Sequence, residues 1–250
     1  MVVVADAAAA IAEGARLVAA TLVAAVADRG RADWCVTGGS TAAGIYRALA
    51  DEPLRSEVGW GSVHAWWSDD RYVPRDHPLS NVKPFDDILL GRVAIPVDQL
   101  HPFRTSEAIG RASGAAWCAA TLAGELRAAA LPAMDGWPSF DLLMLGVGVD
   151  GHILSVFPGS PALGAVALAM AIPAPTHIEP HVERVTLNPA VVGSARRVLV
   201  LAAGKGKARV IGEIFGPTRD PARWPAQLAR RDGATWILDE AAAAHMPPLR

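Results

Sequence analysis

The sequence contains little cysteine, and its charges nearly balance. Only two cysteines occur in 250 residues, Cys35 and Cys118, and they form no Cys-x-x-Cys motif. This excludes a disulfide-stapled scaffold and a thiolate metal site, and a reduced cytoplasmic protein is the simpler expectation. The formal net charge of -2 gives no general attraction to nucleic acid or to an anionic membrane, so neither is expected as a partner. Any basic site must be local.

Long uncharged segments are also scarce. Asp6, Glu13 and Arg16 interrupt the Ala-rich N-terminus, and its longest uncharged part, Leu17–Ala27, is too short to span a bilayer. We expect an amphipathic helix there. Hydrophobic residues make up 52% of the chain and charged residues 19%, a balance that predicts a packed globule rather than a disordered chain.

Short apolar runs alternate with helical patterns along the chain. Strands are expected at residues 2–5, 32–37, 63–68, 140–145, 166–172, 185–187, 197–202 and 235–238. Helices are expected at residues 7–28, after 38–41, through 85–89, at 107–131 and through 210–214. This alternation predicts an α/β fold with a Rossmann-like, mainly parallel sheet and helices on both faces. Residues 1–250 contain no repeat or linker, so a single domain is expected.

Helix caps follow from the residues at two expected starts. Ser40 or Thr41 is the expected cap of the helix after residues 38–41. Ser80 or Asn81 is the expected cap of the helix through residues 85–89.

One stretch combines a buried strand with groups that can carry out chemistry. Residues 140–152 read FDLLMLGVGVDGH, an apolar run that ends in a Gly-rich turn, and ligands bind beyond such strand ends in open α/β sheets. His152 is the side chain best suited to move a proton near neutral pH, and Asp150 can orient it. The turn's backbone N–H groups, including those of Gly148 and Gly151, are candidates to stabilise an oxyanion. A plain tight turn, whose histidine binds a carbonyl, is the alternative.

Three further strand ends carry polar or charged residues. Gly38-Gly39-Ser40-Thr41 enters a helix and offers N–H groups and hydroxyls to an anion such as phosphate. Arg71 can bind a phosphate with two nitrogens, and Lys205 stands at another helix entrance, where an anion would offset its charge. None of these motifs is GxGxxG or Walker A, which disfavours dinucleotides and ATP, and no cofactor is expected. Histidines and cysteines lack metal-ligand spacing, so no metal is expected either.

Together these segments resemble a known family. GGST (38–41), SDDRYVP (68–74), HPLSN (77–81), FDLLMLGVGVDGH (140–152), SVFPGSPAL (155–163), RVT (184–186) and AAGKGKA (202–208) occur in this order, and they resemble 6-phosphogluconolactonase. That family hydrolyses 6-phosphoglucono-δ-lactone to 6-phosphogluconate in the pentose phosphate pathway. The resemblance runs from about Gly38 to Ala241, and it implies a Rossmann-like sheet related to the glucosamine-6-phosphate isomerase/deaminase fold.

The resemblance also implies roles for individual residues. His152 is then the catalytic base and Asp150 its partner. The phosphate and substrate residues are then Gly38, Gly39, Ser40, Thr41, Asp70, Arg71, Asn81, Arg184 and Lys205. Three places depart from the family pattern: Asp70 replaces a Glu, Ala42 replaces a Pro, and Ile153-Leu154 replaces smaller, more polar residues.

The expected function is lactone hydrolysis by His-activated water, with a phosphorylated sugar lactone as the partner and a monomer or weak homodimer as the assembly. One alternative is an amino-sugar-phosphate isomerase or deaminase, whose relatives continue after Gly-His with Asn-Glu-Pro rather than Ile-Leu-Ser. Another is a non-catalytic sugar-phosphate-binding module, which would normally carry a DNA-binding helix-turn-helix.

Overall fold

A seven-stranded sheet forms the centre of the computed structural model, which describes residues 1–248. Its strands lie in the order β1-β12-β11-β8-β2-β3-β5, and every pairing between neighbours is parallel. Their bounds are β1 (Val2–Val4), β12 (Ala234–Asp239), β11 (Arg197–Ala202), β8 (Leu142–Gly146), β2 (Ala32–Val36), β3 (Val63–Trp67) and β5 (Leu100–His101). The mainly parallel α/β sheet predicted from the sequence is therefore confirmed.

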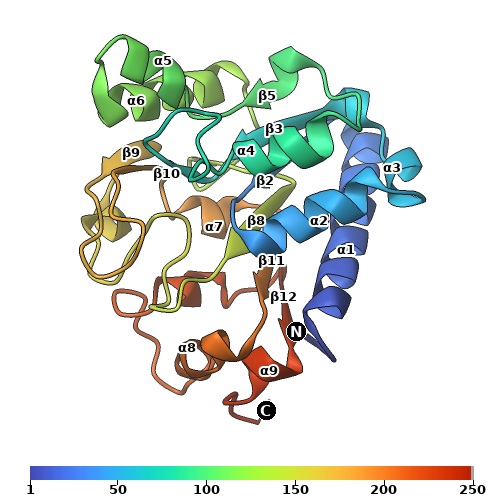
Figure 1. Ribbon diagram of the computed structural model, residues 1–250, viewed down its shortest axis with the longest axis vertical. Helices are drawn as coiled ribbons and strands as arrows, with labels where there is room; N and C mark the ends of the chain where they lie inside the picture. The colour runs from blue at the N-terminus through green and yellow to red at the C-terminus, as the bar shows by residue number, and fades with distance from the viewer. Residues whose placement is uncertain (249–250) are drawn as a thin grey trace.

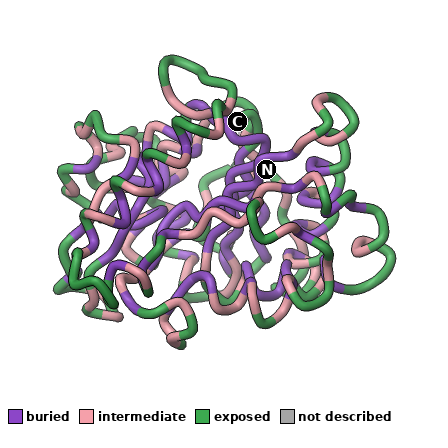
Figure 2. The backbone as a smooth tube through the Cα atoms, turned by 90° about the horizontal axis from the view of Figure 1, so that it is seen from above, coloured by how far each residue is buried: buried purple, intermediate pink, exposed green. Residues whose placement is uncertain are grey.

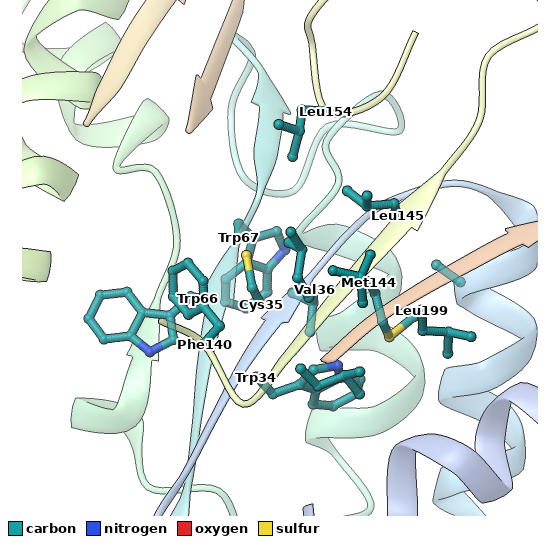
Figure 3. Close-up of a cluster of buried hydrophobic side chains, with 14 of the residues drawn as sticks. Trp34, Cys35, Val36, Trp66, Trp67, Phe140, Met144, Leu145, Leu154 and Leu199 are labelled. Carbon is teal, nitrogen blue, oxygen red and sulfur yellow. The ribbon is translucent and has the colours of Figure 1, made fainter. Parts of the chain in front are cut away.

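The middle strands are apolar because both of their faces are covered. All five residues of β2 are buried, and so are the first four of β8. Trp34, Trp66 and Trp67 are fully buried, and Figure 3 shows them beside Phe140 and Met144, side chains that come from separate parts of the chain. Figure 2 shows the buried segments gathered in the middle of the molecule and exposed loops around them. This packing fixes the strand ends that carry the site.

Two helices cover one face of the sheet, with α2 (Ser40–Ala50) packed against α1 (Ala7–Arg29) (Figure 1). The Asp6 side chain accepts the Ala9 N–H at the start of α1, and Gly30 ends the helix with a φ of 73°. Within residues 1–248, α1 is the one helix long and apolar enough to cross a membrane by length and composition. Its Val18 and Leu22 are fully buried in the core, so this face of the helix packs against the rest of the protein.

The other side of the sheet carries a smaller antiparallel sheet and further helices (Figure 1). The small sheet has the order β4-β10-β9, and β6 pairs with β7. The bounds are β4 (Asp69–Arg71), β10 (Arg184–Leu187), β9 (Ala169–Ile172), β6 (Ala133–Met134), β7 (Trp137–Pro138), α5 (Thr105–Gly110), α6 (Gly114–Ala128), α7 (Val191–Ser194) and α8 (Ala208–Ile214). The shorter helices elsewhere are α3 (Leu54–Glu57), α4 (Lys83–Phe85), which continues as a π-helical turn over Asp86–Leu90, and α9 (Glu240–Ala243).

Several local predictions were wrong. The helix expected at 107–131 is broken into α5 and α6, because Ala112 and Gly114 adopt positive φ values of 51° and 79°. The expected caps also differ, since α2 begins after Gly39 and α4 after Val82, and neither start has a side-chain cap among the described residues. β9 begins at Ala169 rather than at residue 166.

Candidate active site

The candidate site lies where the order of successive strands reverses its direction across the sheet. β2 leads on to β3, whereas its neighbour β8 leads on to β11, so the crevice between β2 and β8 is the switch point at which α/β sheets bind ligands. A cavity of about 320 Å³ opens there. It is lined by residues that follow three adjacent strands and by residues from the small sheet: Gly38–Ala42, Asp69, Arg71, Asn81, Gly146–Val149, His152, Leu154, Ile178, Arg184 and Lys207.

Asp150 and His152 form a hydrogen-bonded pair in the 146–152 turn. The Nδ1 atom of His152 lies 2.6 Å from Oδ1 of Asp150. Burial alone would raise the pKa of Asp150, but hydrogen bonds and charge from His152, with a further bond from His177, hold it well below its usual value. Asp150 therefore remains a carboxylate, and it stabilises a proton on His152. His152 lines the cavity, with its ring half-buried.

Both glycine N–H groups that were expected to face a ligand are used within the turn. The N–H of Gly148 donates to the carbonyl of His152, and the N–H of Gly151 donates to the carbonyl of Gly148. Gly151 is buried beneath Trp224, with a φ of 85°. The expectation that the N–H groups of Gly148 and Gly151 stabilise an oxyanion was therefore wrong, because the turn uses both to hold its own shape.

The Gly38–Thr41 segment enters α2 as predicted and lines the cavity. Gly39 has a φ of 98°, which favours glycine. A Cβ on Gly38 would lie 1.8 Å from Oδ1 of Asn81, so only glycine fits beside that amide. Within residues 1–248, the hydroxyls of Ser40 and Thr41 make no capping bond, and the helix entrance is open to an anion.

Two arginines meet beside this helix entrance. Arg71 on β4 is the direct register partner of Arg184 on β10, and both side chains line the cavity. Arg184 is only 4% exposed. Burial lowers its pKa, and the charge of Arg71 lowers it further. Nη1 of Arg71 donates to the Leu79 carbonyl, while its buried Nε has no acceptor within the described chain. Like charges directly opposed across strands are unfavourable, and an anion between them would remove that repulsion.

Asp70 is placed differently from the prediction. It is 0% exposed and accepts N–H groups from Arg71 at 2.7 Å and from Asn81 at 2.6 Å, with Ser80 Oγ at 3.1 Å. Burial raises its pKa to about 7 against these bonds. The prediction that Asp70 contacts the substrate was therefore wrong, because its side chain is buried behind Arg71 and Asn81 and does not line the cavity.

Asn81 borders the cavity as predicted. Its Nδ2 donates to the Asp69 carbonyl at 3.0 Å, whereas its buried Oδ1 has no donor among residues 1–248. That oxygen is packed against Gly38, which leaves no room for a side chain there.

The lysine prediction selected the wrong residue of the Lys205-Gly206-Lys207 turn. Lys205 is exposed, and the lysine that lines the cavity is Lys207. Its Nζ donates to the Val147 carbonyl at 2.6 Å. Burial lowers the pKa of Lys207, and the nearby carboxylate of Asp150 opposes that shift. The motif contains both lysines, and the 3₁₀ turn places only Lys207 at the cavity.

The structure also brings in residues that the sequence did not indicate. His177, from the segment between β9 and β10, contacts Asp150, and its neighbour Ile178 lines the cavity.

Ser155, close to His152 in sequence, donates its hydroxyl to Asp69 at 2.7 Å and is not placed as a nucleophile. Within residues 1–248, no three His, Cys, Asp or Glu side chains are grouped to hold a metal ion.

Fold and cavity together define an α/β protein with an Asp–His pair and a cavity lined by two arginines at one sheet edge. The family model described as glucosamine-6-phosphate isomerases/6-phosphogluconolactonase matches residues 5–237, and the chain belongs to this family. It is 37% identical to a 6-phosphogluconolactonase of Mycobacterium tuberculosis, over 94% of this chain and 93% of that one. It is 35% identical to a Synechocystis 6-phosphogluconolactonase, over 90% and 88% of the two chains.

Solved structures agree with this assignment. The 6-phosphogluconolactonase of Trypanosoma brucei superposes with a TM-score of 0.84 at 30% identity, over 98% of this chain and 97% of that one. A monomeric glucosamine-6-phosphate deaminase superposes with a TM-score of 0.78 at 16% identity, a likeness that shows the fold alone. The family and fold predicted from the sequence are thus confirmed.

Proposed function

We propose that this chain is a 6-phosphogluconolactonase, which hydrolyses 6-phosphoglucono-δ-lactone to 6-phosphogluconate with water activated by His152. One observation carries the proposal: a paired imidazole and an arginine-lined anion site share one cavity. The substrate has two matching parts, a phosphate at one end and a reactive lactone carbonyl at the other. The names of the relatives support the same substrate.

The phosphate is the part of the substrate that the cations bind. Arg71 and Arg184 oppose each other with one buried Nε unused, and the entrance of α2 adds its N–H groups and the positive end of its dipole. Lys207 supplies a third cation in the role that the sequence had assigned to Lys205. Binding the non-reacting end in this way reduces the entropic barrier to alignment of the carbonyl.

The imidazole then performs the proton transfers. Nδ1 of His152 donates to Asp150, which leaves Nε2 free to take a proton from water as that water attacks the lactone carbonyl. Asp150 stabilises the resulting imidazolium. The C–O ring bond breaks as His152 returns the proton to the leaving oxygen. General base catalysis supplies roughly 10²–10⁴ in rate.

The experiment compares three compounds with the purified chain: 6-phosphoglucono-δ-lactone, glucono-δ-lactone and glucosamine 6-phosphate. Lactone loss is followed by coupling to 6-phosphogluconate dehydrogenase for the phosphorylated lactone and by acid release for the other, each corrected for spontaneous opening. We expect turnover of the phosphorylated lactone, a far lower kcat/KM for the unphosphorylated lactone, and no ammonia from the amino sugar. Ammonia release, or equal rates with both lactones, would refute the proposal.

A further inference from the structure

A second histidine contacts the carboxylate of the candidate active site. Resting on the function proposed above, we infer that His177 is a positioning residue: it holds Asp150 in the orientation from which that carboxylate directs His152. His177 comes from the segment between β9 and β10, which is remote in sequence from the 146–152 turn. Nothing in the motifs around Asp150 and His152 indicated its involvement.

The two carboxylate oxygens of Asp150 have separate partners. Oδ1 lies 2.6 Å from Nδ1 of His152, and Oδ2 lies 2.9 Å from Nε2 of His177. A donor on each oxygen fixes the plane of the carboxylate as well as its position. The turn holds its own shape, and the backbone N–H of His152 also donates to Oδ1 at 3.2 Å. Within residues 1–248, His177 is the one group that bonds Oδ2, so it supplies the restraint on that oxygen.

An aromatic side chain holds the two imidazoles in place. The ring of Phe157 lies 4.8 Å from that of His152, and it meets the ring of His177 edge-on at 5.5 Å. Phe157 is itself buried. Both imidazoles are thus packed against one ring and bonded to one carboxylate.

The segment that carries His177 is bound to the site at a second point. Arg184 donates from Nη2 to the Pro180 carbonyl at 2.9 Å and from Nε to the Val182 carbonyl at 3.2 Å. Ile178, next to His177, lines the cavity. The segment is therefore positioned both by the anion site and by Asp150, and it connects the two halves of the cavity.

The charges around Asp150 set the direction of the expected pH effect. His152, His177 and Lys207 face Asp150, whereas His181 and Glu179 on the same segment pair with each other at 3.1 Å. His177 bonds Oδ2 and thereby holds Oδ1 toward Nδ1 of His152. Without His177 the carboxylate can turn away from that nitrogen, and the imidazolium then loses part of the negative charge that stabilises it.

The variants His177→Ala and His177→Gln test the inference, because the Gln amide can donate from nearly the same position as Nε2. Loss of one hydrogen bond to a carboxylate predicts a kcat about five- to tenfold lower for His177→Ala, with KM changed less than about twofold. The acid limb of its kcat/KM profile should move to lower pH, because the imidazolium loses part of its partner charge. His177→Gln should recover most of the lost kcat. His181→Ala is the matched control, because it removes a histidine of the same segment whose ring nitrogens contact Pro175 and Glu179 instead of Asp150.

NMR titration of the His152 ring in the unliganded protein makes the test independent of the substrate. We expect the His152 midpoint to fall in His177→Ala and to stay near the wild-type value in His181→Ala. An unchanged kcat and midpoint in His177→Ala would overturn the inference. Equal defects in the Ala and Gln variants with an unchanged midpoint would also overturn it, since they indicate loop packing alone. If the wild-type chain lacked lactonase activity, the proposed function would fail while the titration still decided the role of His177.

Discussion

Substitution of the two lysines after β11 tests whether Lys207 binds the phosphate and whether Lys205, two residues earlier, does not. Lys207 lines the cavity, whereas Lys205 is exposed, and both belong to the same 3₁₀ turn. Lys→Met keeps the length and apolar stem of the side chain and removes the charge, together with the donor that Lys207 uses for the Val147 carbonyl. The variants Lys207→Met and Lys205→Met are therefore a matched pair.

The expected magnitude follows from the bond that is lost. A hydrogen bond to a charged group contributes about 1.5–3 kcal/mol, which corresponds to roughly 10- to 150-fold in binding. We expect Lys207→Met to raise KM for 6-phosphoglucono-δ-lactone within that range and to leave kcat nearly unchanged. Lys205→Met should remain within about twofold of the wild-type KM, since a solvated charge contributes little.

Initial rates with the coupled assay measure both constants, and glucono-δ-lactone serves as the substrate control. Because glucono-δ-lactone has no phosphate, Lys207→Met should leave its kcat/KM unaltered. The reasoning would be refuted by equal KM values in the two lysine variants. A drop in kcat at constant KM would also refute it, because that pattern would place Lys207 at the reacting carbonyl.

Further predictions concern Asp70, Gly38 and Arg184. Burial raises the pKa of Asp70 from 3.8 to about 7, so the folded chain holds this proton more tightly than the unfolded chain. The bound proton therefore stabilises the folded chain fully below about pH 4. This stabilisation is lost as the pH rises toward 7, at ~1.4 kcal/mol per pH unit and by at most about 4 kcal/mol in total. In Asp70→Asn, the free energy of unfolding measured with urea should differ less between pH 5 and pH 8 than in the wild-type chain, with little change in KM. An unaltered difference between the two pH values would contradict this prediction. Gly38→Ala should displace the Asn81 amide and raise KM at least about tenfold, with crystallography of the variant as the check. Arg184→Gln should raise KM for the phosphorylated lactone at least as strongly; an unchanged KM there would exclude phosphate contact.

The sequence predicted the part of the site that depends on strand ends. An apolar run followed by GVGVDGH gave β8, its turn and the Asp150–His152 pair, since the carboxyl ends of parallel strands meet at one edge. GGST was likewise placed at the entrance of α2. These features are local, and each is encoded within about ten residues.

Features that depend on long-range packing were not predictable in the same way. Lys205 and Lys207 are equivalent in sequence, and the 3₁₀ turn alone orients them. Asp70 and Arg71 are adjacent, but alternation along β4 sends one side chain into the core and the other into the cavity. His177 reaches Asp150 only through a segment that β9 and β10 position, and no local pattern marks such a contact.

In the proposed mechanism, His152 takes a proton from the attacking water while other groups bind the phosphate. The most direct measurement pairs kcat of His152→Ala with its Kd for 6-phosphogluconate from calorimetry. The account predicts a kcat lower by about 10²–10⁴, measured above the spontaneous rate, and a Kd within about twofold of the wild-type value. A kcat equal to that of the wild-type chain would contradict the account.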